Sequence, residues 1–250
     1  MTKQSGRLLW YTRSLAAGPC EVGDEMIREI YHFFRYGPET QKRQRELGLV
    51  EFLKSMAKEL DADGYAELRT SLVGDLEGDI LEIGAGTGAT FPYYGPQAKV
   101  TAIEPNEELR AAAGGVAKGA KAEIRVLPGA GEELPFEDAT FDVVSASLVL
   151  CSVASPSKTL EEFKRVLRPG GQVRLMEHVR SEHWLAGPLM DLLNPIWLRV
   201  NKIGCNWDRK TVESVQDAGF TIRSIEPYKI YSKAVPAVFP LRIIKAERPA

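Results

Sequence analysis

Apolar residues recur at helical spacing in the first third of the chain. Residues 24–73 are therefore predicted to be helical. A first helix is expected to end at Gly37 and Pro38, and it carries one apolar face, formed by Met26, Ile27, Ile30, Phe33 and Phe34. A second apolar stripe consists of Leu49, Leu53, Met56 and Leu60, and residues 64–73 suggest a short third helix. Packing against the core explains these stripes, and the alternative is that the first helix also covers a ligand.

The pattern changes at residue 79 to strands that alternate with helices. Five short β-rich runs are bounded by glycine, proline or acidic residues, at 79–84, 99–104, 122–127, 141–148 and 171–178. Helical patterns follow at 106–118, 157–167 and 208–219. Two late strands, 220–227 and 240–248, are expected to pair as a hairpin at a sheet edge. Such alternation predicts an α/β fold with a seven-stranded, Rossmann-like sheet covered by helices on both faces.

The predicted organisation is a helical cap of residues 1–75 on an α/β domain of residues 76–250. Residues 181–206 interrupt the alternation with an apolar segment that includes Trp184 and Trp197. We interpret this segment as a lid over a ligand, and a surface for a partner protein is the alternative.

Composition narrows the class of function. The chain has 44% hydrophobic and 26% charged residues, and its 32 basic and 34 acidic residues give a formal charge of -2. This balance gives no basic footprint, so no nucleic-acid partner is expected. No stretch approaches the ~20 apolar residues of a membrane span, and residues 1–20 lack the apolar core of a signal peptide. We therefore expect a cytoplasmic protein, with no prediction of its oligomeric state.

The cysteines predict no structural metal site. Cys20, Cys151 and Cys205 are widely spaced, which is typical of a reducing compartment and gives no CxxC pair. Metal binding by these cysteines and by His32, His178 and His183 stays open, but no metal is predicted.

A glycine loop and a later acid indicate a nucleoside site. The sequence ILEIGAGTGAT places three glycines, Gly84, Gly86 and Gly88, between a strand and a helix, where a backbone without Cβ atoms can approach a ligand. The next strand ends at Glu104, whose carboxylate can accept hydrogen bonds from both ribose hydroxyls. A strand-to-helix turn and a helix N-terminal charge explain these residues without a ligand. The pair alone also fits a nicotinamide-dependent oxidoreductase.

Four segments together carry a family resemblance. LEIGAGTG, the acid of AIEPN, GAGEELPFEDATFDVV and RVLRPGG occur in this order, at the expected distances. Over residues 76–247 the chain resembles the class I S-adenosylmethionine-dependent methyltransferases. The segments LVLCSV (148–153), MEHV (176–179) and IGCN (203–206) are most similar to the small-molecule thiol methyltransferases of the methyltransferase-like group and their bacterial relatives.

The resemblance implies S-adenosylmethionine as cofactor and assigns roles to matching positions. The loop of Gly84 and Gly86, oriented by Glu82, would hold the methionine moiety, and Glu104 would bind the ribose. The segment that cradles adenine often carries an acid where this chain has Ala130, so backbone groups would replace that contact. The full set of implied cofactor-binding residues is Glu82, Gly84, Ala85, Gly86, Gly88, Glu104, Pro105, Ala130, Gly131, Ser147 and Leu148.

The acceptor is expected over the carboxyl ends of the strands. His178 follows a strand and is the candidate catalytic base for a hydroxyl or thiol, with a purely structural histidine as the alternative. Glu177 is a second candidate base, or orients His178. Cys151, Trp184 and Trp197 are expected to line the acceptor pocket. The predicted function is methyl transfer to a small, largely apolar molecule, with sulfur slightly preferred over oxygen. A cofactor-binding protein of the same fold that catalyses another reaction, or only recruits a partner, is the alternative.

Overall fold

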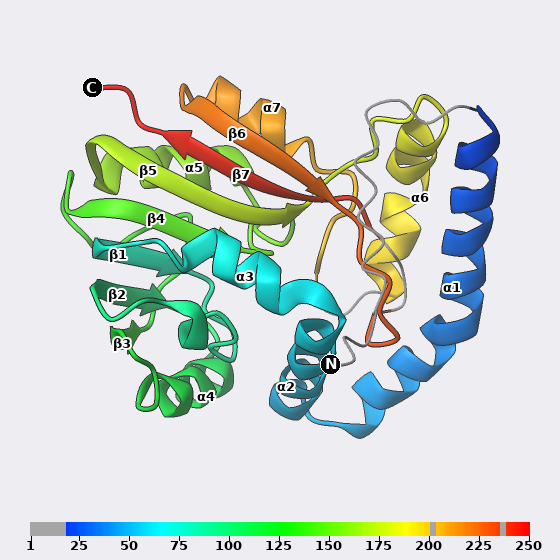
Figure 1. Cartoon of the computed structure of the whole chain (residues 1–250), viewed down its shortest axis with the longest axis horizontal. Coiled ribbons are helices and arrows are strands. Elements are labelled where there is room, and N and C mark those ends of the chain that lie inside the picture. Colours follow the sequence, from blue (N-terminus) through cyan, green and yellow to red (C-terminus); the bar gives the residue numbers. More distant parts are fainter. Residues whose placement is uncertain (1–18, 201–203, 236–238) are drawn as a thin grey trace, which may run out of the picture.

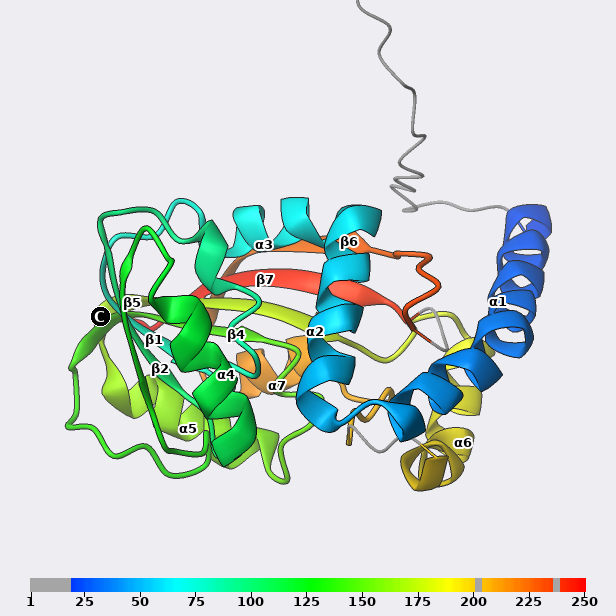
Figure 2. The same ribbon diagram turned by 90° about the horizontal axis from the view of Figure 1, so that it is seen from below.

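The computed structural model describes residues 19–200, 204–235 and 239–250. It contains a seven-stranded sheet with helices on both faces, which confirms the predicted Rossmann-like α/β fold (Figures 1 and 2). Residues 1–18, where no targeting signal is predicted, lie outside the described part of the chain.

Helices α1 (Pro19–Glu46), α2 (Leu49–Leu60) and α3 (Ala66–Val73) precede the sheet, with a π-helical turn at Asp61–Tyr65. The predicted helix end at Gly37 and Pro38 is wrong, because α1 continues through Pro38 and bends along its length (Figure 1). Proline in a helix interior costs about 3 kcal/mol, and contacts beyond the helix offset that cost. Arg43 pairs with Glu59 of α2 at 3.1 Å, and His32 contacts the Val235 carbonyl at 3.1 Å. The side chains of the predicted stripe from Met26 to Phe34 lie outside the described residues.

The strands form the order β3-β2-β1-β4-β5-β7-β6. Five of them are parallel: β1 (Gly78–Ile83), β2 (Ala98–Ile103), β3 (Glu123–Leu127), β4 (Phe141–Ser147) and β5 (Leu167–His178). The predicted hairpin, β6 (Thr221–Tyr228) with β7 (Leu241–Glu247), is confirmed, and β7 runs antiparallel to β5. The chain reverses its direction of growth between β1 and β4. This switch point is where open α/β sheets bind ligands, at the carboxyl ends of the strands.

Side chains from both faces of the strands enter two separate cores. One core joins α3 and α4 (Glu107–Ala117) to the sheet through residues such as Leu72 and Ile80. The other joins α5 (Pro156–Val166) and α7 (Thr211–Asp217) through residues such as Phe163 and Leu81. Ile80 and Leu81 are adjacent on β1 and both fully buried, as expected for a parallel strand covered on each face.

The apolar insertion forms helix α6 (Ala186–Val200), which lies beside α1 at the end of the molecule (Figures 1 and 2). Trp197 on this helix is buried, whereas Leu192 and Ile196 are 73% and 56% exposed. Among the described residues, no helix is both long and apolar enough to cross a membrane.

Candidate active site

The glycine loop after β1 combines packing with open space. Gly84, Gly86 and Gly88 have φ values of 64°, 55° and 80°, a region that favours glycine. A Cβ at Gly84 would lie 2.7 Å from Val149, and one at Gly88 would lie 2.9 Å from Phe91. A Cβ at Gly86 would meet no heavy atom within 4 Å. Two of the glycines therefore serve packing, and Gly86 faces a space that a ligand can fill.

Glu104 is the acid that holds this loop. It follows β2 and is 6% exposed, and its carboxylate accepts hydrogen bonds from the backbone N–H groups of Gly86 and Asn106, each at 2.9 Å. Ala85 N–H also donates to the Ile103 carbonyl at 3.0 Å. A carboxylate has about four acceptor positions, so Glu104 keeps capacity for further donors such as two hydroxyls.

Glu82, the acid that was expected to orient the glycine loop, is buried on β1. Its carboxylate is buried and accepts a 2.6 Å hydrogen bond from the Tyr94 hydroxyl, which also contacts Ser145 at 2.8 Å. Burial raises the pKa of Glu82 to about 7, although the Tyr94 hydrogen bond opposes the shift. Glu82 therefore contacts Thr90, at the end of the glycine segment, and Tyr94 just beyond it, and its role in orienting the loop stays a prediction.

The expected adenine segment lies beyond β3. Ala130 is exposed and its carbonyl accepts from Glu133 N–H at 3.3 Å. Gly131 is buried, and a Cβ there would come within 3.0 Å of Thr159. Pro105 is exposed after β2. Ala130 and Pro105 thus lie at the surface beside the strand ends, and Gly131 packs inside.

A strained turn follows β4 at Ser147 and Leu148. Leu148 has a φ of 60°, which is unusual for a residue with a side chain, and its N–H donates to the Met176 carbonyl at 2.7 Å. Residues in such conformations cost of order 1–3 kcal/mol and often occur at functional sites.

Glu177 holds the segment after this turn. Its fully buried carboxylate accepts from the N–H groups of Val149, Leu150 and Cys151 at 2.8, 2.9 and 3.2 Å. These bonds show that Glu177 fixes a backbone loop, so neither of its two expected roles, as base or in orienting His178, matches its contacts.

A cavity of about 120 Å³ lies beyond the ends of β4 and β5. Leu148 and Cys151 line it from the turn after β4, and His178 lines it from the end of β5. The rest of its wall comes from α1, α2, the π-helical turn, α6, the segment after α6 and the segment before β7. It includes Phe52, Met56, Tyr65, Trp197 and Phe239. The volume equals that of about four water molecules. Most of the wall is apolar, and its polar side chains are Thr40, Gln41 and Gln44 of α1, Ser152, and the group of Cys151, His178 and Cys205.

Part of this polar lining is a cluster of two thiols and an imidazole. The ligand atoms of Cys151, His178 and Cys205 all lie within 4.8 Å of one another, and His178 Nδ1 is 3.4 Å from Cys205 Sγ. The hydrogen bond between the thiols, together with burial, raises the pKa of Cys151. The same bond lowers the pKa of Cys205, and His178 acts in the same direction.

Aromatic rings cover the cavity, but not the pair that was predicted. Trp197 stacks on Trp207 with centroids 4.9 Å apart, and Phe239 packs edge-on against both rings and His178. Trp184 is 78% exposed and does not line the cavity. Its predicted place at the acceptor is therefore wrong. Trp184 precedes α6, whereas Trp197 lies on the helix face that is buried.

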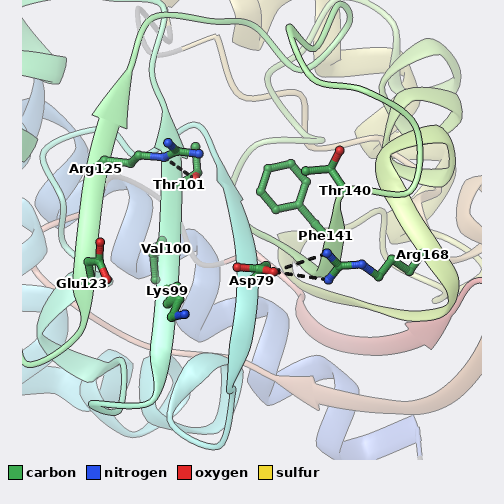
Figure 3. A pocket seen from close by; sticks show the side chains of 9 residues that line it. All are labelled: Asp79, Lys99, Val100, Thr101, Glu123, Arg125, Thr140, Phe141 and Arg168. Atoms are coloured by element: carbon green, nitrogen blue, oxygen red, sulfur yellow. Dashed lines mark hydrogen bonds and ion pairs between the residues drawn. The ribbon is translucent and has the colours of Figure 1, made fainter.

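A larger pocket, of about 300 Å³, opens at the opposite edge of the sheet (Figure 3). Its lining is charged, and Arg168 reaches across it to Asp79 at 3.4 Å, while Arg125 donates to Thr101 at 2.8 Å. These residues lie near the amino ends of the strands, away from the glycine loop and Glu104. The cavity at the carboxyl ends is thus the one that adjoins the candidate cofactor site.

Sequence reasoning missed several residues of the site. Tyr94, Trp207 and Phe239 carry no local motif, and α2 contributes Phe52 and Met56 from a stripe interpreted as core. An apolar stripe looks the same whether it faces a core or a small cavity, so no signal in the sequence separated the two.

Comparison with known proteins places these features in context. Residues 81–175 match the family described as "Methyltransferase domain". The chain is 35% identical to thiol S-methyltransferase TMT1B of Rattus norvegicus over 165 residues, which cover 62% of this chain and 67% of the relative. It is 36% identical to thiol S-methyltransferase TMT1A of Homo sapiens over 151 residues, which cover 57% of this chain and 59% of that relative.

Similarity to solved structures supports the same architecture. The crystal structure of a putative methyltransferase from Bacillus halodurans superposes with a TM-score of 0.62 at 16% identity. The superposition covers 75% of this chain and 99% of the other. At this level of identity the likeness shows the fold alone.

Proposed function

The chain belongs to the class I S-adenosylmethionine-dependent methyltransferases, and from this premise we propose that it methylates the sulfur of a small, largely apolar thiol. The observation that carries the proposal is a mostly apolar cavity whose wall contains the cluster of Cys151, His178 and Cys205. The thiol S-methyltransferase names of the relatives support the same choice of acceptor.

The candidate cofactor residues fit S-adenosylmethionine. Gly86 leaves open the space that a Cβ would fill, and Glu104 retains acceptor capacity for the ribose hydroxyls. We assign the remaining contacts to the neighbouring strand ends: Gly84, Ala85, Gly88 and Pro105 around the loop, Ala130 and Gly131 at the adenine, and Ser147 and Leu148 toward the methionine end. Glu82 acts behind this site, through Tyr94, rather than on the cofactor.

S-adenosylmethionine supplies a methyl group already activated by a sulfonium, so the protein must chiefly align the acceptor and exclude water. The segment 148–151 meets both requirements. Val149 packs against Gly84 of the glycine loop, and Leu148 and Cys151 line the cavity. The acceptor bound there lies next to the loop that holds the cofactor.

The size of the cavity favours a small acceptor. A space of about 120 Å³ is below the usual 300–1,000 Å³ of drug-sized ligand sites. Its aromatic and aliphatic wall stabilises apolar groups by about 25 cal/mol per Å² of surface removed from water. Cys205 and His178 in the wall give the acceptor sulfur a place beside polar groups.

His178 is the proposed catalytic residue, acting within the cluster rather than as an isolated base. Its Nδ1 is engaged with Cys205 Sγ at 3.4 Å, and the ring packs edge-on against Phe239 with centroids 5.3 Å apart. These contacts fix the imidazole at the wall of the cavity. A thiol needs little help to ionise, because its ordinary pKa lies near 8.5. The cluster therefore has mainly to orient the sulfur.

Formation of S-adenosylhomocysteine with a panel of small thiols and their matched phenols and alcohols tests this proposal. We expect each thiol to turn over at least tenfold faster than its oxygen counterpart at neutral pH, because a larger fraction is ionised. Turnover of phenols without thiols would overturn the choice of sulfur. Binding of S-adenosylhomocysteine without turnover of any acceptor would instead favour a non-methylating role of the same fold.

The cellular location of the protein is a further part of the proposal. We assign the protein to the cytoplasm, because a reducing compartment keeps Cys151 and Cys205 as thiols, as the cluster requires. Trapping of a disulfide between them in the protein as isolated from fresh cells would contradict this assignment.

A further inference from the structure

The cluster of Cys151, His178 and Cys205 has the composition of a metal site. Each residue offers one ligand atom, and all three atoms lie within 4.8 Å of one another. Zinc in catalytic sites is held by three protein ligands and keeps a fourth position for water or substrate, and two cysteines with one histidine are a known combination.

The distances are close to those of tetrahedral zinc. Bond lengths of about 2.3 Å to sulfur and 2.0–2.1 Å to nitrogen place neighbouring ligand atoms roughly 3.5–3.8 Å apart. His178 Nδ1 and Cys205 Sγ are already 3.4 Å apart. The largest separation in the cluster, at most 4.8 Å, needs a contraction of about 1 Å, which side-chain rotation of a cysteine provides.

The charges also balance. Cys151 is fully buried, and a buried charge is costly unless it is paired or coordinates a metal. Two thiolates and a neutral imidazole compensate the double charge of Zn²⁺, and the thiol protons leave to solvent as the metal–sulfur bonds form. Thiolate and imidazole are both ligands that suit zinc.

Asn206 holds the two cysteines in place. Its backbone N–H and side-chain Nδ2 both donate to the Cys151 carbonyl, at 2.7 and 3.0 Å. On the other side of the cluster, Trp197 Nε1 donates to the Cys205 carbonyl at 2.8 Å. The loop after β4 and the segment after α6 are thus fastened together at the cluster. This is a physical role for the sequence Gly204-Cys205-Asn206, for which the sequence alone suggested none.

We propose that Cys151, His178 and Cys205 bind one Zn²⁺ ion, whose fourth position opens to the cavity and holds the acceptor as a thiolate. All three residues line that cavity, so an acceptor sulfur reaches the ion directly. The S–H bond of the acceptor breaks, a metal–sulfur bond forms and the proton leaves to solvent. The role toward the acceptor rests on the proposed thiol methylation, whereas the metal site itself stands on the cluster.

The test begins with the full chain, reduced and freed of metal. Titration with Zn²⁺ is expected to give one equivalent with a dissociation constant below 1 µM, a range typical of sites with thiolate ligands. Co²⁺ in place of zinc is expected to give a thiolate-to-cobalt charge-transfer band. Cys151→Ser and Cys205→Ser should each weaken Zn²⁺ binding at least 100-fold, while Cys20→Ser, the matched control for the loss of one thiol, keeps it.

A second measurement uses the wild-type protein alone. Zn²⁺ should raise the melting temperature and a chelator should reverse the rise, because a ligand stabilises the state that it binds. Absence of one-to-one binding in wild type, or equal binding after Cys205→Ser in a variant with wild-type circular dichroism, overturns the metal site. Thiol turnover that continues in metal-free protein would overturn only the role of zinc toward the acceptor. One-to-one binding without thiol turnover would instead leave the metal site standing and contradict the proposed function.

Discussion

Replacement of Glu104 by alanine separates loop support from ligand binding. The carboxylate accepts two backbone hydrogen bonds, from Gly86 and Asn106, each at 2.9 Å. Hydrogen bonds to a charged group contribute about 1.5–3 kcal/mol each, and the ribose hydroxyls would add two more. Glu104→Ala should therefore weaken binding of S-adenosylhomocysteine by roughly 2–4 kcal/mol, about 30- to 700-fold.

The same change should also lower stability. The N–H groups of Gly86 and Asn106 lose their acceptor in a site where Glu104 is 6% exposed. We expect a loss of roughly 2 kcal/mol, which for a chain of this length lowers the melting temperature by about 4–8 °C. A role confined to ligand contact, which the sequence alone suggested, would leave the melting temperature unchanged.

Calorimetric titration with S-adenosylhomocysteine and thermal unfolding of the ligand-free protein measure the two effects independently. Glu108→Ala is the matched control, because Glu108 is exposed in the first turn of α4 and its loss changes the net charge equally. It should keep wild-type affinity. If Glu104→Ala lowered the melting temperature but bound the ligand within threefold of wild type, the carboxylate would only hold the loop, and our placement of the ribose would be refuted.

Three other perturbations test the remaining parts of the site. Gly86→Ala should lower stability by about 1–2 kcal/mol, because its φ is 55°, and should weaken cofactor binding at least tenfold in calorimetry. Gly84→Ala should chiefly destabilise the fold, because its Cβ would lie 2.7 Å from Val149. Normal binding by Gly86→Ala would show that the loop only makes a turn. Trp197→Ala should raise the acceptor KM roughly tenfold at saturating cofactor. Trp184→Ala should leave this KM unchanged, because Trp184 is exposed and lies outside the cavity. Equal effects of the two variants would contradict the cavity as the acceptor site. Burial raises the pKa of Glu82 from 4.5 to about 7, so its contribution to stability is complete below pH 4.5 and is lost as the pH rises through 7. Glu82→Gln should therefore remove on the order of 3 kcal/mol of pH dependence between pH 4.5 and 8, and unfolding curves of unaltered slope against pH would disprove the burial argument.

The fold was predictable because each strand and most helices have a recognisable pattern in their own short stretch of sequence. Parallel strands buried on both faces leave short apolar runs, and glycine, proline and acidic residues mark their ends. The helix end predicted at Pro38 failed because that rule considers only the helix. In the structure, His32 before the proline and Arg43 after it contact other segments, which helps α1 to continue through Pro38.

The candidate site was predictable only where the residues of a function lie together in one short segment of sequence. The loop of Gly84 to Gly88 and the acid at Glu104 are such cases. Which face of a helix turns inward depends on the whole molecule. The sequence pattern therefore predicted the same role for Trp184 and Trp197, although Trp184 is 78% exposed and Trp197 is 6% exposed. The partner of Glu82, Tyr94, likewise has no motif that marks it.

The segment from Leu148 to Cys151 shows why the two halves of the site depend on each other. Its turn contains Leu148 at a φ of 60°, an arrangement that is costly unless the surroundings impose it. Glu177 imposes it from β5, through three backbone N–H groups that converge on one buried carboxylate. Held in this way, the segment touches the glycine loop through Val149 and carries Cys151 into the cavity. Four consecutive residues thus connect the glycine loop to the cavity, and Glu177 fixes their position through their backbone N–H groups.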